Sequence, residues 1–249
     1  MCDQWMPHIS LPLTIEQFRR LPRNPAYKYE YLDHQAFLSP HPQHYHAVLD
    51  LVPLDNRAGE NSAVAAMAEK VPDPFIPDRL EADQLLNLAP LFAAAFRNIE
   101  PYGCLEEETR LEAARQALER TRSGGDGPFI QQASFVARQE GKPIGAILTT
   151  LLPDGDPCDW DCYHWQEAPP IDCIEHRLGQ PHLTWVFVSP LLKGRSIGTA
   201  LLAATMRELL AMGYKQLLST FMAGNDSSML WHWRCGFRLV TYAGSRRKG

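Results

Sequence analysis

The stretch TWVFVSPLLKGRSIGTALL, residues 184–202, decides the fold of this chain. Its first part is an apolar run typical of a buried β-strand, and it ends at Pro190. Residues 194–200 then lead into a helix, and Gly194 and Gly198 leave room for a ligand close to the backbone. The first N–H groups of a helix have no partner within it and lie at its positive end. The stretch therefore predicts a strand, a loop and a helix that together suit a pyrophosphate group.

Glycines in a strand-to-helix turn have more than one explanation. The turn is not a P-loop, because no Gly-Lys-Ser/Thr follows, and the spacing of a dinucleotide-binding turn is absent. A tight turn in which glycine serves only packing remains the structural alternative. If the turn does bind phosphate, the guanidinium of Arg195 can add a side-chain contact.

A second stretch, NDSSMLWHWRCGF at residues 225–237, gives the turn a more specific meaning. It predicts a helix that begins at Asn225 and ends at a Gly-Phe pair. RSIGTA, with Arg195, Gly198 and Ala200, resembles the Q/R-x-x-G-x-G/A signature of the GNAT superfamily of N-acetyltransferases. Asn225, Ser228 and Gly236-Phe237 resemble the second motif of the same family.

The order of elements from residue 78 onward also resembles the GNAT fold. We predict helices over 85–99, 106–122, 196–213 and 225–235, a hairpin over 133–152, and strands over 183–188, 215–223 and 237–243. Pro90 should bend or restart the first helix. The fold class implied is α/β, a GNAT-like mixed β-sheet flanked by helices.

Residues 1–76 read as an N-terminal extension, and residues 77–249 as the transferase domain with an inserted loop at 153–181. The extension should contain a short helix, a β-hairpin that turns near Asp33-His34, a strand over 46–53 and a linker. Only twelve residues follow Phe237, which is room for one strand where the family usually has two. We expect the N-terminal hairpin, or the second subunit of a homodimer, to cover that sheet edge.

The resemblance implies an acetyl-CoA site in the gap between strands 183–188 and 215–223. Backbone groups of Phe187 and Val188 would pair with the pantetheine arm, which Asn225 and Ser228 would also help to hold. The N–H of Val188 would polarise the thioester carbonyl. The pyrophosphate would lie on Gly194, Arg195, Ser196, Ile197, Gly198, Thr199 and Ala200.

His232 stands seven residues after Asn225, where the second motif of the family often has a Tyr that protonates the departing thiolate. An imidazole can serve as that acid, or it can simply pack within the helix. A Cys–His nucleophile with Cys235 is conceivable, although a buried structural thiol is the simpler explanation. Trp231 and Trp233 are expected to be core or cofactor-wall residues.

The general base is less clear from the sequence. Strand 183–188 contains no Asp or Glu. His182 and Glu175 precede it, and Thr184 could hold a water. We name His182 with His232 and Val188 as the candidate catalytic residues.

The loop at 153–181 carries Cys158, Cys162, His164, Cys173 and His176, enough soft ligands for a zinc site. Because their spacing fits no well-defined zinc finger, we expect no metal. The alternative is an acidic and aromatic lid beside the acceptor site. Its carboxylates would favour a cationic amine; they belong to Asp154, Asp156, Asp159, Asp161 and Glu167.

Charge and composition exclude several other classes of protein. The net charge of −5 gives no general attraction to nucleic acid or to an anionic membrane. No apolar run approaches the ~20 residues that a membrane helix needs. The N-terminus lacks the basic start and apolar core of a signal peptide, so we expect a cytoplasmic protein.

These observations predict an N-acetyltransferase that transfers the acetyl group of acetyl-CoA to a primary amine by direct attack. The acceptor is a small molecule or a peptide. Two alternatives stay open: an acyl-CoA-binding protein without catalysis, and an interaction module that zinc stabilises through the loop at 158–176. Metal content separates the last from the other two, and turnover separates the first two.

Overall fold

The computed structural model describes residues 9–21, 27–40, 44–51, 77–99, 102–157, 163–222 and 225–240. The chain divides into two units, one of residues 1–45 and 221–229 and the other of residues 46–220 and 230–249. Among the described residues, no helix has both the length and the apolar character needed to cross a membrane.

The elements from residue 77 onward follow the predicted order. The described strands are β1 (Ile9–Pro12), β2 (Tyr27–Leu32), β3 (Gln35–Pro40), β4 (His44–Asp50), β5 (Pro77–Arg79), β6 (Phe135–Gln139), β7 (Lys142–Leu152), β8 (Gln180–Val188), β9 (Gln216–Met222) and β10 (Arg238–Leu239). The helices are α1 (Ile15–Arg20), η2 (Ala82–Leu88), α3 (Ala89–Ala95), η3 (Tyr102–Cys104), α4 (Glu107–Arg122), η4 (Gln131–Ala133), η6 (Pro190–Leu192), α5 (Ile197–Ala211) and α6 (Asp226–Arg234), of which the η segments are 3₁₀ helices.

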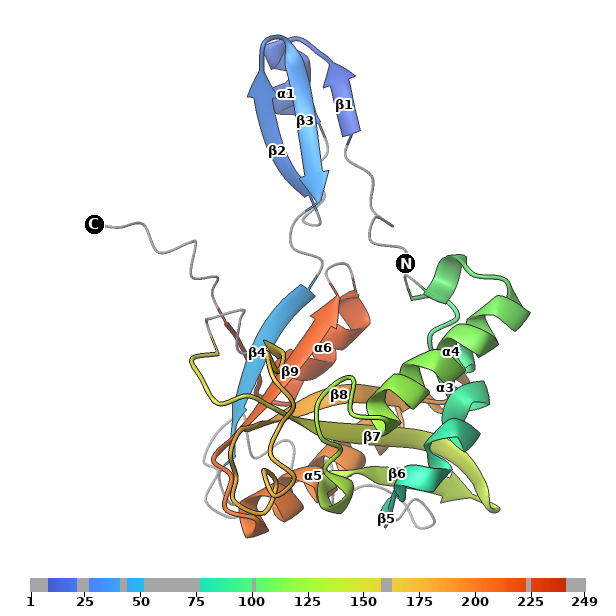
Figure 1. The fold of residues 1–249 in the computed structure, drawn as a ribbon. Coiled ribbons are helices and arrows are strands. Elements are labelled where there is room, and N and C mark those ends of the chain that lie inside the picture. Colours follow the sequence, from blue (N-terminus) through green and yellow to red (C-terminus); the bar gives the residue numbers. More distant parts are fainter. Residues whose placement is uncertain are drawn as a thin grey trace. The chain divides into compact units, whose positions relative to one another are not determined.

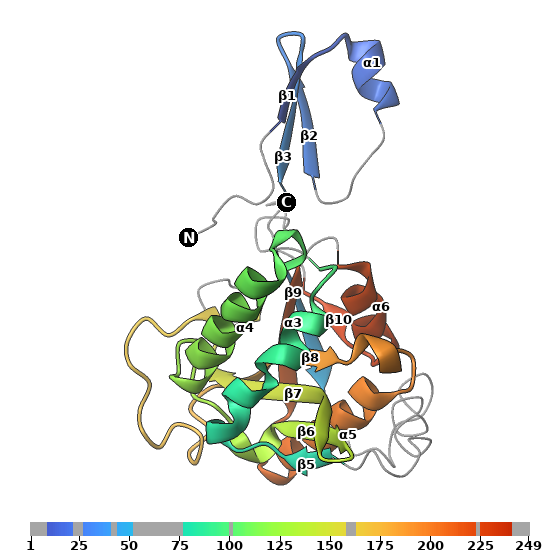
Figure 2. The same cartoon turned by 90° about the vertical axis from the view of Figure 1, so that its right-hand side faces the viewer.

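A mixed sheet forms the centre of the larger unit, and its described strands lie in the order β10-β4-β9-β8-β7-β6-β5. Helices α3 and α4 lie on one face of the sheet and α5 on the other (Figures 1 and 2). Ala146 packs into the cluster around α3, whereas a Cβ at Gly145 would lie 3.0 Å from Ile197 of α5. Neighbouring residues of a strand point to opposite faces, so these contacts agree with the two helical layers. The predicted α/β fold class is confirmed.

Strand β4 comes from the N-terminal extension yet lies within this sheet, between β9 and β10. Val48 of β4 pairs with Arg238 of β10. The carboxylate of Asp50 accepts hydrogen bonds from Gln216 and Arg238, each at 2.9 Å. The extension therefore supplies a strand between β9 and β10, while the prediction that the hairpin covers the sheet edge is wrong, because β2 and β3 belong to a separate sheet and β10 is the last described strand of this one.

The predicted hairpin belongs to a small three-stranded sheet in the order β1-β3-β2. Asp33 and His34 have φ of 49° and 60°, so the hairpin turns at the predicted residues. Thr14 caps α1 and forms a capping box with Gln17, so the extension contains the predicted short helix. The boundary near residue 76 between extension and transferase domain remains our proposal.

The helix predicted over 85–99 consists of two segments. The 3₁₀ helix η2 ends at Leu88, and α3 begins at Ala89 with Pro90 in its first turn. Proline tolerates the first turn because its missing N–H would have no helical partner there. The chain therefore restarts at Pro90, as predicted. The last strand is shorter than expected, since β10 ends at Leu239 and the residues after 240 lie outside the described part.

Aromatic side chains tie α3 to β8. Phe92 is fully buried, and its ring centroid lies 4.8 Å from that of Trp185 and 5.2 Å from that of Phe187. The indole N–H of Trp185 donates to the hydroxyl of Thr121 of α4 at 3.0 Å. Burial of each large side chain contributes about 1.5–3 kcal/mol. This packing holds β8, on which the predicted site depends, from one side.

Candidate active site

Strands β8 and β9 pair only near their beginnings. In the described part of the chain, the parallel ladder between them ends with the pair Leu183 and Ser219. β8 continues to Val188. Its edge away from β7 is therefore open over residues 184–188, which we call the open edge. This is the gap between the two strands that the family resemblance implies.

A β-bulge marks the point where the open edge begins. Leu148 of β7 pairs with Trp185, whereas Thr149 pairs with Leu183, so Thr184 is the extra residue of β8. Bulges bend a strand and re-aim its side chains, and they are frequent next to active sites. No pattern in the sequence predicts this bulge.

The alternation of the β7–β8 ladder decides which backbone groups face the open edge. The N–H of Ser189 donates to the carbonyl of Ile144 of β7 at 2.8 Å. Backbone groups alternate in direction along an antiparallel strand, so those of Phe187 also face β7. Those of Val186 and Val188 face away from β7. The geometry thus favours Val186 over the predicted Phe187 as a backbone partner of pantetheine. Val188, which was also predicted, faces the open edge and remains a candidate partner.

The loop before α5 enters the helix through two residues in the left-handed region, Gly194 with φ of 85° and Ser196 with φ of 59°. Ser196 is the N-cap, but its side chain makes no capping hydrogen bond. The N–H of Ala200 donates to the Ser196 carbonyl at 2.9 Å, so the N–H groups of residues 197–199 have no acceptor within the helix. A left-handed serine costs of order 1–3 kcal/mol, and such strain clusters at ligand clamps.

The predicted pyrophosphate residues share this turn, but they do not contribute in the same way. Ile197 and Thr199 are buried, so their side chains are not surface contacts for a ligand. Arg195 is exposed. A Cβ at Gly198 would lie 3.7 Å from the side chain of Val188, which brings the helix start next to the end of the open edge.

Trp231 of α6 borders the same place. A Cβ at Gly198 would lie 3.5 Å from its indole nitrogen. Trp231 is half-buried and fits the predicted role of a wall beside the cofactor. Trp233 is 68% exposed. It does not lie in the core, so that part of its prediction is wrong. The helix turns it outward because it lies two positions from Trp231.

His232 is buried, with 3% of its surface exposed. Its Nε2 lies 2.7 Å from the hydroxyl of Ser219 of β9. Its ring meets the rings of Trp231 and Phe237 edge-on, at centroid distances of 4.9 and 4.8 Å. An acid that serves a bound thiolate must reach it, so this geometry favours the packing role over the acid role.

His182 is also buried, and both of its ring nitrogens have partners. Nδ1 lies 3.1 Å from the hydroxyl of Thr184, and Nε2 lies 2.9 Å from that of Thr220. Burial, together with the neighbouring His46 and His232, lowers the pKa of His182 to about 3. An imidazole with so low a pKa is a weak base at neutral pH. The geometry therefore favours a structural role for His182 over that of general base.

Two further candidates fare differently. Burial raises the pKa of the Cys235 thiol to about 12, against an opposing hydrogen bond with Thr199, so the thiolate needed by a nucleophile is disfavoured. Glu175 is exposed on the inserted loop.

Asn225 accepts a hydrogen bond from the N–H of Ser228 at 3.1 Å and so begins α6 as predicted. Contacts of Asn225 and Ser228 with pantetheine remain a prediction.

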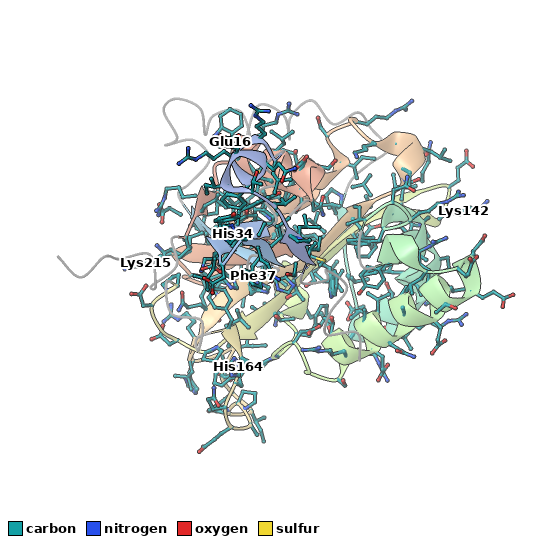
Figure 3. All side chains as sticks on the ribbon, turned by 90° about the horizontal axis from the view of Figure 1, so that it is seen from above. Glu16, His34, Phe37, Lys142, His164 and Lys215 are labelled. Atoms are coloured by element: carbon teal, nitrogen blue, oxygen red, sulfur yellow. The ribbon has the colours of Figure 1, made fainter. Side chains whose placement is uncertain are left out.

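The inserted loop carries the residues of the zinc alternative. Cys158 and Cys162 lie outside the described residues. Within the described residues, no three His, Cys, Asp or Glu side chains gather as a metal site would require. Cys173 is buried, whereas His164 and His176 are exposed, and Figure 3 shows His164 on the projecting loop.

The described part of this loop is fastened at two points. The ring of Tyr163 lies 3.7 Å from that of His46, and the indole N–H of Trp165 donates to the carbonyl of Leu151 at 2.8 Å. Three of the acidic residues assigned to a lid are exposed, namely Asp154, Asp156 and Glu167, while Asp159 and Asp161 lie outside the described residues. The role of an acidic lid remains a proposal.

Comparison with known proteins agrees with the two sequence motifs. The profile of the Acetyltransferase (GNAT) family matches residues 91–237, more than half of the chain. The chain therefore belongs to the GNAT acetyltransferase family, whose members are generally acetyl-CoA-dependent enzymes. No curated protein matches the sequence.

Several solved structures are similar to this chain. The PaiA N-acetyltransferase of Thermoplasma acidophilum in complex with coenzyme A is 14% identical, with 68% of this chain and 92% of that chain covered and a TM-score of 0.44. The aminoglycoside N-acetyltransferase AAC(6')-Iy in complex with CoA is 17% identical, with 65% and 89% covered and a TM-score of 0.38. A GCN5-related N-acetyltransferase from Ralstonia eutropha is 18% identical, with 68% and 96% covered and a TM-score of 0.41.

Proposed function

We propose that this protein transfers the acetyl group of acetyl-CoA to a primary amine of a small molecule or a peptide. The observation that carries the proposal is the open edge of β8, which ends beside the N-terminus of α5. Val186 and Val188 offer backbone groups that can pair with a pantetheine arm as with an added strand. The N–H groups of residues 197–199 suit the pyrophosphate. Because the two places adjoin, one extended ligand can occupy both.

The reaction needs no covalent intermediate on the protein. The nitrogen lone pair of the amine attacks the thioester carbonyl carbon, the C–N bond forms, and the C–S bond breaks. The proton that the nitrogen loses ends on the sulfur of CoA. In this proposal the N–H of Val186, which faces the open edge as that of the predicted Val188 does, donates to the carbonyl oxygen while negative charge develops on it, and Val188 pairs with the pantetheine arm.

The two faces of the sheet would then serve different substrates. The cofactor turn lies at α5, on one face. We propose that the amine approaches from the face of α3, since the cofactor itself would occupy the other side of the open edge. Thr184 and Trp185 point to that face, Thr184 toward Thr150 and Trp185 toward Phe92.

Calorimetric titration with CoA tests the cofactor site. It compares two variants in which an arginine at or near α5 is replaced by glutamate. Arg195→Glu places a carboxylate beside the proposed pyrophosphate, and we expect affinity to fall at least tenfold. Arg207→Glu is the matched control, because Arg207 is exposed further along α5 and should leave affinity within twofold. Equal weakening by both variants, or no binding to the wild type, would remove the proposed site.

Turnover is a separate question from binding. We expect release of free CoA thiol from acetyl-CoA when benzylamine, spermidine or lysine amide is added as acceptor. Tight CoA binding without any amine-dependent turnover would instead support the alternative of an acyl-CoA-binding protein without catalysis.

A further inference from the structure

A chain of polar side chains closes the narrow end of the gap between β8 and β9. It crosses four neighbouring strands of the sheet, with one contact leading to the next. The oxygen and nitrogen distances are 3.0 Å for His46 to Thr220, 2.9 Å for Thr220 to His182, 3.1 Å for His182 to Thr184 and 2.8 Å for Thr184 to Thr150. We call these five side chains the floor.

The far end of the floor has a fixed polarity. The hydroxyl of Thr150 lies 2.8 Å from the backbone carbonyl of Asp126, which can only accept. Thr150 therefore donates its single proton to that carbonyl, and it must accept from Thr184. A weaker contact of Thr184 with the His182 carbonyl, at 3.4 Å, does not compete with the one at 2.8 Å.

This one constraint orders every proton back along the chain. Thr184 donates its hydroxyl proton to Thr150, so it must accept from the Nδ1–H of His182. The Nε2 of His182 then carries a lone pair and accepts from Thr220. Thr220 in turn accepts from the Nδ1–H of His46. All donors point one way, from β4 toward β7.

Because every hydrogen bond of the floor points from β4 toward β7, the floor cannot carry a proton away from the reacting amine to solvent. A proton that moves from donor to acceptor along the floor ends at the Asp126 carbonyl, which cannot hold it. The arrangement instead leaves Thr184 with one lone pair unused, because a hydroxyl oxygen has two and His182 takes only one. Thr184 is half-buried at the start of the open edge, on the face opposite α5.

We propose that the hydroxyl oxygen of Thr184 accepts a hydrogen bond from the N–H of the acceptor amine and so aims its lone pair at the thioester. This inference rests on the proposed function. Thr184 touches the substrate, whereas His182, Thr220 and His46 are positioning residues that act through it. The N-terminal strand β4 would thus contribute to acceptor use through His46.

The first test needs no substrate. Long-range ¹H–¹⁵N NMR spectra report which imidazole nitrogen carries the proton, and His46→Gln and His182→Gln assign the signals. We expect both histidines to be protonated at Nδ1 and not at Nε2 between pH 6 and 8. A proton on Nε2 of His182 would reverse the chain and leave Thr184 a donor, which would overturn the proposal.

The second test measures kinetics with the most active amine of benzylamine, spermidine and lysine amide. Thr184→Val keeps the shape but removes the oxygen, and we expect the KM for the amine to rise about tenfold with CoA affinity unchanged. Thr184→Ser should restore KM to within threefold. Thr220→Val should raise KM less, by about fivefold, with recovery in Thr220→Ser; these factors correspond to the ~0.5–1.5 kcal/mol of one hydrogen bond.

The outcomes separate this proposal from the proposed function. A Thr184→Val variant with wild-type KM and kcat would overturn the amine contact while the enzyme stands. Absence of turnover in the wild type would overturn both the transferase activity and the amine contact. In that case the tautomer of His182 alone decides whether the directed floor is correct.

Discussion

The open edge and the floor adjoin on one strand, yet they have opposite properties. At the open edge, the backbone groups of Val186 and Val188 face away from β7, and the turn before α5 is strained at Ser196. In the floor, five side chains from four strands use one another as partners. The edge can gain backbone partners, while the floor uses its side-chain protons internally and keeps one unused lone pair, on Thr184.

The difference teaches how a binding edge can persist in a folded protein. Unpaired backbone groups along a strand invite the neighbouring strand to close over them. Here the hydrogen bond between His182 and Thr220 joins β8 to β9 just where their ladder ends. The bulge at Thr184 turns β8 aside at the same place. A tightly specified floor thus stands beside an edge that stays open.

The largest effect expected is the loss of folding stability at low pH, which acts on the floor through His182 and not on the open edge. His182 has a pKa of about 3 in the folded protein, below its ordinary value of 6.5. The unfolded chain therefore binds a proton that folded His182 does not, so stability is full above pH 6.5 and is lost as the pH falls toward 3. The loss is at most about 1.4 kcal/mol per pH unit from this one group.

Urea unfolding between pH 7 and 4 measures this loss. His182→Gln removes the titrating group, and its free energy of unfolding should fall less steeply with pH than that of the wild type. Arg195→Gln at the turn, which changes no group that titrates in this range, should keep the wild-type slope. Identical slopes for His182→Gln and the wild type would show that the floor does not exclude the proton.

How far the sequence predicts the molecule depends on the range of the contacts. The turn at residues 194–200 and the start of α6 at Asn225 are local, since the residues that define them are near neighbours in the chain, and both were predicted. The floor joins His46 to Thr220 across 174 positions, so no spacing rule can predict it. β4 was predicted as a strand, but its place between β9 and β10 depends on the whole sheet.

An intermediate effect is expected at His232, which lies near both regions. If it packs against Ser219, His232→Gln keeps a hydrogen-bonding side chain, so we expect less than a threefold fall in kcat and a loss of about 1 kcal/mol in stability. If it is the acid, kcat should fall by about 10²–10⁴. Steady-state kinetics at saturating acetyl-CoA and amine distinguish the two, and the larger fall would restore the acid role.

The smallest effect concerns the strain stored beside the open edge. Ser196 and Gly194 both adopt positive φ, but only glycine does so at no steric cost. Ser196→Gly relieves the strain while adding entropy to the unfolded chain, so we expect a net gain of about 0.5 kcal/mol. Gly194→Ala is the mirror experiment: a Cβ there meets no atom within 4 Å, so any loss, about 1 kcal/mol, comes from φ alone. Thermal unfolding of both variants should give shifts of opposite sign. Shifts of the same sign would mean that packing, not backbone conformation, governs this turn, and that its strain is not available to hold the N–H groups of α5 in place for a phosphate.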